Sequence, residues 1–408
     1  MSPPMTTRAT RKHDPEAWRL RFPILETCTY LVNHSLGAMP RSVVDKLRHY
    51  HEQWAMRGVR AWAEGWWEAP VTIGDLVGRI VNAPEGTVVM HQNVSLIQSI
   101  VASALDFSTR RNKVVYSSLH FPTCMYVWEA QKRRGARISM VASPDGITVP
   151  TELMCAAIDE ETLIVPISHV LYKSSYKQDV EAIVARAHEV GALVLLDCYQ
   201  STGTVPIDVQ ALGVDMICGG SVKWLCGGPG AAFLYTRPEL LETLEPSITG
   251  WAAHADPFAF ELGEQRYAQG PWRMLHGSPA VVALYAASAG HETILEVGVE
   301  AIRAWSIRLT EELRADLSDR GFRVTSPADP ERRGGTLTVG LAEDEDGPAF
   351  VKALEQESIL VDHRPDAGIR VSPHFYTRRS ELAEFAEVLS ALRASGKWKD
   401  FVDRAGVY

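Results

Sequence analysis

Residues 192–230 read ALVLLDCYQSTGTVPIDVQALGVDMICGGSVKWLCGGPG. The apolar run that begins at Ala192 ends in Asp197, and a second apolar run, from Met216, leads into Gly-Gly-Ser-Val-Lys223 and further glycines. Runs that are apolar on both faces are typical of buried strands in a sheet covered by helices. Open α/β sheets bind ligands at the carboxyl ends of their strands, so this stretch predicts that Asp197 and Lys223 share one ligand-binding edge.

The same alternation of short apolar runs with helical stretches extends from about residue 75 to residue 240, including a helical run over Val180–Val190. It predicts an α/β fold: a large domain with a mainly parallel seven-stranded sheet covered by helices on both sides. The predicted strands are Val88–Met90, Lys113–Ser117, Ile138–Val141, Leu163–Ser168, Ala192–Asp197, Met216–Gly219 and Ala231–Tyr235.

The pattern becomes long and helical after Pro279. We expect one helix over Val281–Ala289 and, after Gly290, a second over Glu296–Arg314. Strands then follow at Phe322–Thr325, Thr336–Gly340, Ile359–Val361 and Ile369–Val371. We predict a smaller α+β C-terminal domain over residues 286–408, a large domain over 51–285, and an N-terminal arm, 1–50, that packs on the small domain.

Composition excludes several classes of function. The chain has 408 residues, is 46% hydrophobic and 22% charged, and carries a formal charge of −9. It has no basic stripe for a nucleic acid, and its polar start, Met1 to Asp14, lacks the apolar run of a signal peptide or membrane span. Its six cysteines lack CxxC spacing, so we predict no metal site and a cytoplasmic location.

Lys223 and Asp197 together predict the chemistry. A lysine among apolar residues and glycines is readily neutral and nucleophilic, and such an amine forms imines with aldehydes. A carboxylate on the neighbouring strand end keeps a pyridine nitrogen protonated, which makes the ring an electron sink. We therefore predict pyridoxal 5'-phosphate joined to Lys223 as a Schiff base, with Asp197 at the far end of the ring. Taken singly, a residue like Lys223 is more often a surface lysine in a loop, and one like Asp197 is more often a helix cap.

Several motifs resemble those of the fold-type-I pyridoxal-phosphate enzymes, in the class V aminotransferase group, and within it the kynureninases. The Gly-Trp-x-x-His-x-x-Pro-Phe pattern that starts at Gly250 is the most specific to kynureninase. The segments that carry the resemblance are Tyr30–Gly37, His120–Thr123, Leu196–Asp197, Lys223–Gly230, Gly250–Phe260, Gly277–Pro279 and Gly368–Pro373.

The resemblance implies roles for further residues. Phe121 stacks on the cofactor ring and Ser168 lies near its hydroxyl, while Trp251 and Ser278 reach the phosphate from the partner subunit of a homodimer with shared active sites. Gln200 and Ser221, beside the two central residues, complete the predicted cofactor set. A plain core phenylalanine is the alternative for Phe121.

Two further sets of residues are predicted to bind ligand groups. Asn93, Val94 and Ser95 begin a helix, whose free N–H groups suit a phosphate, although a simple N-cap explains them equally. Arg370 resembles the family's clamp for the substrate α-carboxylate, with His34 and Ser35 beside it. A surface salt bridge is the alternative for Arg370.

The sequence also departs from the kynureninase pattern. Kynureninases carry Tyr immediately before the Schiff-base lysine, and the wider group usually has His there, whereas this chain has Val222. Gln200 stands where kynureninases have His, and Asn33-His34 is more similar to the isopenicillin-epimerase-like members. The loss of two polar groups beside the reacting centre argues against simple kynurenine hydrolysis.

These observations predict a kynureninase-like enzyme of specialised metabolism that acts on an L-amino acid with a β-substituent. Lys223 abstracts the α-proton, and Cβ cleavage follows, either by C–C hydrolysis or by C–S β-elimination. A class V aminotransferase, an epimerase or decarboxylating deaminase, and a non-catalytic binding module remain alternatives. A nicotinamide oxidoreductase is discounted because glycines 227, 228 and 230 precede a strand instead of opening a helix.

Two groups of side chains are candidates for auxiliary roles. Trp62, Trp66 and Trp67 either line a roomy aromatic pocket or pack at a subunit interface. Acid–base candidates are His34, His120 and His254, which are equally consistent with structural hydrogen bonding.

Overall fold

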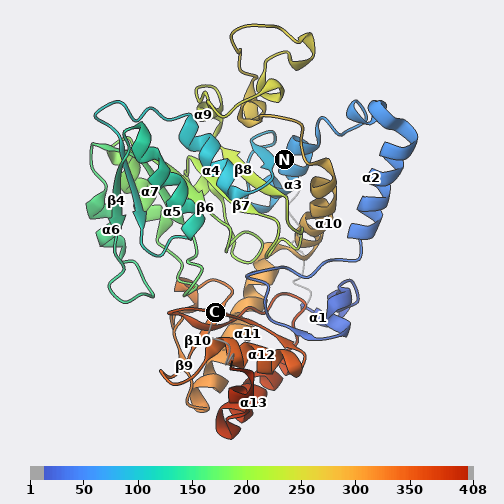
Figure 1. Ribbon diagram of the computed structural model, residues 1–408, viewed down its shortest axis with the longest axis vertical. Helices are drawn as coiled ribbons and strands as arrows, with labels where there is room; N and C mark the ends of the chain where they lie inside the picture. The colour runs from blue at the N-terminus through green and yellow to red at the C-terminus, as the bar shows by residue number, and fades with distance from the viewer. Residues whose placement is uncertain (1–12, 403–408) are drawn as a thin grey trace, which may run out of the picture.

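The computed structural model describes residues 13–402, and at its centre lies a seven-stranded sheet (Figure 1). The order is β2-β8-β7-β6-β5-β3-β4, and only β8 runs antiparallel to its neighbours. The strands are β2 (Val88–His91), β3 (Lys113–Ser117), β4 (Arg137–Val141), β5 (Thr162–Ser168), β6 (Leu193–Asp197), β7 (Met216–Gly220) and β8 (Ala232–Thr236). The predicted mainly parallel seven-stranded sheet is therefore confirmed, with each strand end within about one residue of its predicted place.

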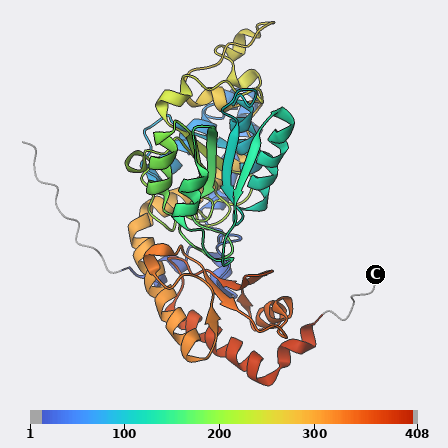
Figure 2. The same cartoon turned by 90° about the vertical axis from the view of Figure 1, so that its left-hand side faces the viewer.

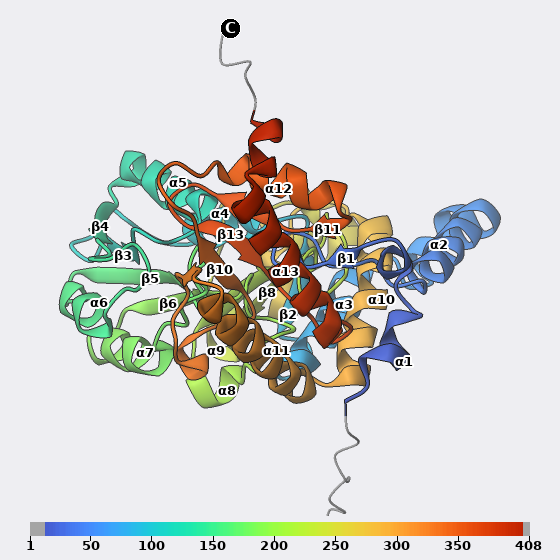
Figure 3. The same cartoon turned by 90° about the horizontal axis from the view of Figure 1, so that it is seen from below.

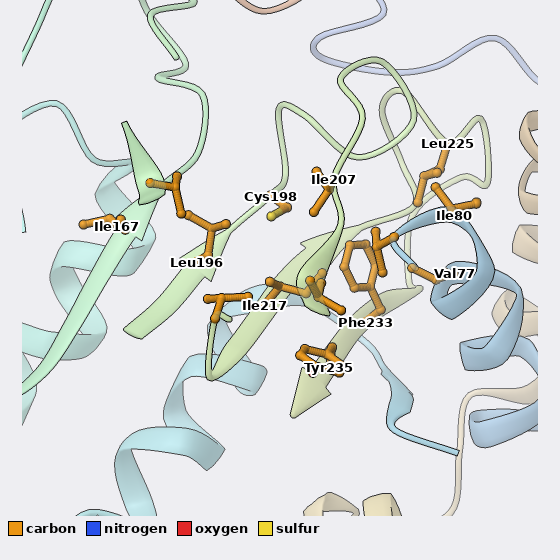
Figure 4. Close-up of a cluster of buried hydrophobic side chains, with 14 of the residues drawn as sticks. Val77, Ile80, Ile167, Leu196, Cys198, Ile207, Ile217, Leu225, Phe233 and Tyr235 are labelled. Carbon is orange, nitrogen blue, oxygen red and sulfur yellow. The ribbon is translucent and has the colours of Figure 1, made fainter. Parts of the chain in front are cut away.

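Helices cover both faces of this sheet, as its doubly apolar strands require. Leu195 packs on one face, in a core that includes α4 (Val94–Ser103) and α5 (Pro122–Ala130). Leu196 packs on the other face, and Figure 4 shows it near side chains of the neighbouring strands, in a cluster that extends to Val77 and Ile80 of α3. The helices of that second face are α3 (Ala69–Ile80), α6 (Thr151–Ala157), α7 (Val180–Glu189) and α10 (Val281–Val297).

A smaller α+β body lies below the large sheet (Figure 2), as the predicted fold class requires, while the predicted boundaries at residues 51 and 286 stay predictions. Its antiparallel sheet has the order β12-β13-β10-β9, and α11 and α13 lie on its outer side (Figure 3). The elements are β9 (Arg323–Val324), β10 (Leu337–Gly340), β12 (Asp362–Arg364), β13 (Gly368–Val371), α11 (Val299–Asp319), α12 (Gly347–Gln356) and α13 (Arg379–Ser395). The sequence pattern missed β12 because its three residues are polar and only partly buried.

The N-terminal part of the described chain contacts both bodies. β1 (Thr29–Tyr30) pairs in parallel with β11 (Ile359–Leu360), while α2 (Val43–Arg57) packs on α10. The short helix α1 (Pro15–Arg19) is tied to the C-terminal body by Arg19, which donates to Glu381 at 2.8 Å. α8 (Val209–Leu212) and α9 (Pro238–Leu241) are short connectors. Residues 1–12 of the predicted arm lie outside the described residues.

Within residues 13–402, the structure contains no helix that combines the length and the apolarity needed to cross a lipid bilayer.

The prediction that a helix ends before Gly290 is wrong. α10 continues through Gly290 to Val297, and α11 begins at Val299 instead of the predicted Glu296. A side chain at Gly290 would place its Cβ 2.2 Å from the carbonyl oxygen of Leu225. Glycine is therefore needed here for the close approach of α10 to the Lys223 loop, and it does not mark a helix end.

This contact predicts the sign of a stability change. Helix propensity alone would make Gly290→Ala stabilising by about 1 kcal/mol. Overlap with the Leu225 backbone should reverse that sign and destabilise the protein by roughly 1–3 kcal/mol. Thermal unfolding measures the difference, with Val282→Ala, at a 44% exposed position of the same helix, as the control. A Gly290→Ala variant more stable than the wild type would contradict this account.

Candidate functional site

The site is a cavity of about 220 Å³ at the carboxyl ends of the central strands. β5 and β6 end at Ser168 and Asp197, and the loop after β7 carries Lys223. The cavity is lined by Asn93, Val94, Ser95, Phe121, Thr123, Cys124, Ser168, Val170, Tyr172, Asp197, Tyr199, Gln200 and Lys223. The structure thus brings together eight of the predicted site residues: Asn93, Val94, Ser95, Phe121, Ser168, Asp197, Gln200 and Lys223.

The Lys223 loop is clamped between two glycines from distant parts of the chain. A Cβ at Gly37 would lie 2.0 Å from the Lys223 carbonyl oxygen, and Gly290 approaches Leu225 equally closely. The Gly37 N–H also donates to the Val222 carbonyl at 2.8 Å. These contacts leave the loop little freedom and hold the lysine side chain inside the molecule.

The Lys223 amine lies close to two aromatic rings. Its Nζ is 4.4 Å from the ring centre of Tyr199 and 5.7 Å from that of Phe121. Burial lowers the pKa of Lys223 to about 8, the nearby Asp197 carboxylate opposes this shift, and the charges of Arg370 and Arg364 reinforce it. A substantial fraction of the amine is therefore neutral near physiological pH, as a nucleophile or base requires.

Asp197 is held by donors on both of its oxygens. The Tyr199 backbone N–H donates to Oδ1 at 2.9 Å, and the Cys124 thiol donates to Oδ2 at 3.2 Å. On the neighbouring strand end, the Ser168 hydroxyl is hydrogen-bonded to His120 Nδ1. Burial lowers the pKa of His120 to about 4, so this imidazole is neutral.

The N-terminus of α4 also lines the cavity. The Asn93 side chain accepts a hydrogen bond from the Leu96 N–H at 2.9 Å, which makes Asn93 the N-cap. The N–H groups of Val94 and Ser95 begin the helix and have no acceptor within it. Both residues line the cavity, so this helix end is suited to an anion.

Arg370 lies beside the cavity without lining it, and its guanidinium is already engaged. Its Nε and Nη2 form a bidentate pair with Asp362 at 2.8 and 2.6 Å. Nη1 donates to the Tyr172 carbonyl at 2.8 Å, and Nη2 lies 3.3 Å from the Ser35 hydroxyl. Asp362 also bonds His34 Nε2 at 2.7 Å, so the predicted substrate residues form one network around this carboxylate.

The electrostatics of this network come from opposing effects. Burial raises the pKa of Asp362, but hydrogen bonds from His34 and Arg370 outweigh it, so the net pKa is well below the usual range. Burial lowers the pKa of His34 to about 4. The network therefore contains an ionised carboxylate and a neutral imidazole.

The remaining predicted residues lie outside the cavity lining. Ser221 is buried and bonds His291 at 2.8 Å. Ser278 lies just before the start of α10, and Trp251 packs against Trp67. Trp62 and Trp66 pack on each other, edge to face. None of the three tryptophans from the 62–67 segment lines the cavity.

The class V aminotransferase model matches residues 29–395 of the chain. The chain belongs to the class V aminotransferase family. It is 29% identical to an uncharacterized aminotransferase of Bacillus subtilis, over 93% of this chain and 98% of that one. It is 27% identical to a kynureninase of Pseudomonas fluorescens, over 93% of this chain and 92% of that one.

Solved structures support the fold of this class V family member. The apo cysteine desulfurase of Thermococcus onnurineus NA1 superimposes with a TM-score of 0.85 at 20% identity, covering 95% of this chain and 100% of that one. The cystine C–S lyase C-DES, in complex with its product cysteine persulfide, gives a TM-score of 0.82 at 19% identity, covering 90% and 99%. The fold is that of the fold-type-I pyridoxal-phosphate enzymes.

The cofactor of this family is pyridoxal 5'-phosphate, and the residues of the cavity fit it. A buried amine suits the aldehyde, a helix N-terminus suits the phosphate, and the Asp197 carboxylate suits the pyridine nitrogen. Phe121, 43% exposed and on the cavity wall, offers a flat apolar face.

Sequence reasoning missed several residues of this class V site. Tyr199 was overlooked although it stands two residues after Asp197, and Tyr172 although it follows the strand that ends at Ser168. Cys124 lies directly after the segment His120–Thr123, but it was assigned no role because the cysteines lack CxxC spacing. No sequence motif around Asp362 indicated a role, because its role comes from pairing with Arg370 on the neighbouring strand of the small sheet.

The pKa of Lys223 predicts how fast the cofactor-free protein takes up pyridoxal phosphate. Below about pH 8 most of the amine is protonated and unreactive, so the rate should rise about tenfold per pH unit and level off above pH 8. Arg364→Gln removes a charge that lowers this pKa, so the midpoint should move upward. Stopped-flow absorbance measures the rate.

Arg320→Gln, at the end of α11, is the matched control and should leave the midpoint unchanged. A midpoint near 10.5, the ordinary value for lysine, would contradict the burial argument.

Proposed function

We propose that this protein is a pyridoxal-phosphate-dependent enzyme that cleaves a bond at the β-carbon of an L-amino acid. When bound, the cofactor supplies an electron sink for the carbanion formed at the α-carbon. Lys223 holds the cofactor and removes the α-proton, Asp197 faces the ring nitrogen, and the start of α4 binds the phosphate. The proposal rests on one observation: a buried, partly neutral amine close to two aromatic rings on the wall of the cavity.

Lys223 is the only amine among the described residues that line the cavity, and we assign it the role of the base. Among the described residues that line the cavity, only Lys223 and Asp197 carry an amine, imidazole or carboxylate. Asp197 is engaged by two donors. Burial raises the pKa of Tyr199 to about 12, so its phenol does not act as a base near neutral pH.

The lack of a second basic side chain among the described residues of the cavity wall favours β-elimination over C–C hydrolysis. C–C hydrolysis requires a second group that activates water at a carbonyl carbon, whereas elimination requires removal of the α-proton and a leaving group that departs with its electron pair. Val222 offers no polar side chain, and both ends of the Gln200 amide are hydrogen-bonded, to the His34 carbonyl and to Trp224 Nε1. A substrate with a thiolate leaving group at the β-carbon suits this cavity best, because its cleavage needs no side chain that activates water.

The Arg370 network supports recognition of one substrate carboxylate. The charges of Arg364, Asp362 and Arg370 sum to +1, so the cluster has room for one more anion. Asp362 occupies the Nε/Nη2 edge of Arg370 and thereby fixes its other edge towards Tyr172 and Ser35. We place the α-carboxylate of the substrate at that second edge.

We also propose a homodimer in which Trp251 and Ser278 reach the phosphate site of the partner. Large apolar side chains are exposed on α2, including Met56, 77% exposed, and on the segment after Trp251, including Leu262, 100% exposed. Exposed apolar clusters of this kind are typical of protein interfaces.

All six cysteines are free thiols, which supports a reducing cytoplasm as the compartment.

The reaction is tested by incubating the holoenzyme with four substrates in parallel: kynurenine, 3-hydroxykynurenine, a cysteine S-conjugate, and an amino acid with a 2-keto acid acceptor. The S-conjugate should consume one water and give pyruvate, ammonia and the free thiol, identified by mass. Lys223→Ala should reduce turnover roughly 10²–10⁴-fold because it removes the base. Faster formation of anthranilate from kynurenine would overturn the preference for elimination.

The carboxylate site is tested by Arg370→Gln. Loss of charge-assisted hydrogen bonds should raise KM about 10–100-fold while cofactor affinity stays unchanged. Asp362→Asn, which loosens the guanidinium without removing it, should raise KM by less. An unchanged KM in Arg370→Gln would rule out this arginine as the carboxylate ligand.

A further inference from the structure

Four buried polar side chains form a chain of hydrogen bonds that ends on Asp197. Trp128 Nε1 lies 2.8 Å from Gln98 Oε1, and Gln98 Nε2 lies 2.9 Å from Cys124 Sγ. Cys124 Sγ in turn lies 3.2 Å from Asp197 Oδ2. Trp128, Gln98 and Cys124 are each at most 1% exposed, so water does not compete for these bonds.

The direction of every bond is fixed from the tryptophan end. An indole N–H donates and never accepts, so the carbonyl end of the Gln98 amide must face Trp128. The NH₂ end then faces the sulfur atoms of Cys124 and, at 3.7 Å, Cys218. A flipped amide would set two donors against each other at 2.8 Å.

It follows that Cys124 is a donor to Asp197. Its sulfur lone pair already accepts from Gln98, and an ionised carboxylate only accepts, so the S–H bond points to Oδ2. Burial raises the pKa of the Cys124 thiol well above its ordinary value, and the Asp197 charge adds to this shift. The thiol therefore remains protonated and able to donate.

We propose that Cys124 is a positioning residue that orients the Asp197 carboxylate towards the cofactor's ring nitrogen, with its own orientation set by Gln98 and Trp128. The Cys124 bond and the Tyr199 N–H each use one oxygen of the carboxylate. Both oxygens keep a further lone pair, and Asp197 lines the cavity, so the free lone pairs are held ready for a pyridinium N–H. The inference rests on the proposed role of Asp197.

The test compares pyridoxal phosphate binding to cofactor-free protein, by quenching of tryptophan fluorescence, in a series of variants. Cys124→Ala should weaken cofactor binding about tenfold, the loss of one hydrogen bond to a charged group. Cys124→Ser keeps a donor and should recover most of that loss. Trp128→Phe frees the Gln98 amide to flip, so the thiol turns from Asp197 to Gln98 and binding weakens severalfold without any change at the cavity wall.

A second readout separates positioning from mere packing. The pH titration of the bound cofactor's visible absorbance follows protonation of the imine nitrogen, whose pKa depends on how firmly the ring nitrogen is held protonated. A loosened Asp197 stabilises the pyridinium less, so the ring withdraws less electron density and the imine pKa should rise in Cys124→Ala. In Cys124→Ser this midpoint should return towards the wild-type value. Cys218→Ala removes a neighbouring buried thiol that has no hydrogen bond to Asp197 and should change neither the affinity nor the midpoint.

Asp197→Asn separates the two proposals. Suppose that Asp197→Asn weakens cofactor binding but Cys124→Ala binds within twofold of the wild type with an unshifted midpoint. The positioning role of Cys124 is then refuted and the role of Asp197 stands. If Asp197→Asn binds the cofactor as tightly as the wild type, the role of Asp197 itself fails, and the role of Cys124 fails with it. Equal losses of cofactor affinity in Cys124→Ala and Cys218→Ala would show a packing effect and also refute the positioning role of Cys124. Should Cys124→Ala not fold, Trp128→Phe and Cys124→Ser decide by the same criteria.

Discussion

The burial of one amine depends on how closely two glycines let the backbone approach the Lys223 loop. Gly37 and Gly290 come from segments more than 200 residues apart, and any side chain at either position would overlap backbone atoms of residues 223–226. This close packing excludes water from the amine, and desolvation is the largest cause of its lowered pKa. The reactivity of the site is thus a consequence of backbone packing some distance from the reacting atoms.

Charged groups modify the effect of desolvation on that amine. Asp197 favours its protonated form, while Arg370 and Arg364 disfavour it, and together with desolvation these charges leave the pKa at about 8. Asp362 weakens the effect of the two arginines because it pairs with both of them. The large domain therefore supplies the residues proposed to hold the cofactor, and the small domain supplies a single surplus positive charge, which is an arrangement suited to an anionic substrate.

Local patterns in the sequence predicted the features that depend on local physics. Strands apolar on both faces revealed the sheet, and the placement of Asp197 and Lys223 after two such strands revealed the cavity. Gly290 was misinterpreted as a helix end because its role lies in a contact with residue 225, which no local pattern contains. Cys124 was missed for a similar reason, since its hydrogen bonds run to Gln98 and Asp197 on other elements.

The central claim is that the Lys223 side chain carries the cofactor. Reduction of the holoenzyme with borohydride fixes an imine as a stable secondary amine, and peptide mass spectrometry then locates it. The account predicts a phosphopyridoxyl group on Lys223 and on no other lysine. A label on a different residue, or an unmodified Lys223 in protein that retains its cofactor, would contradict it.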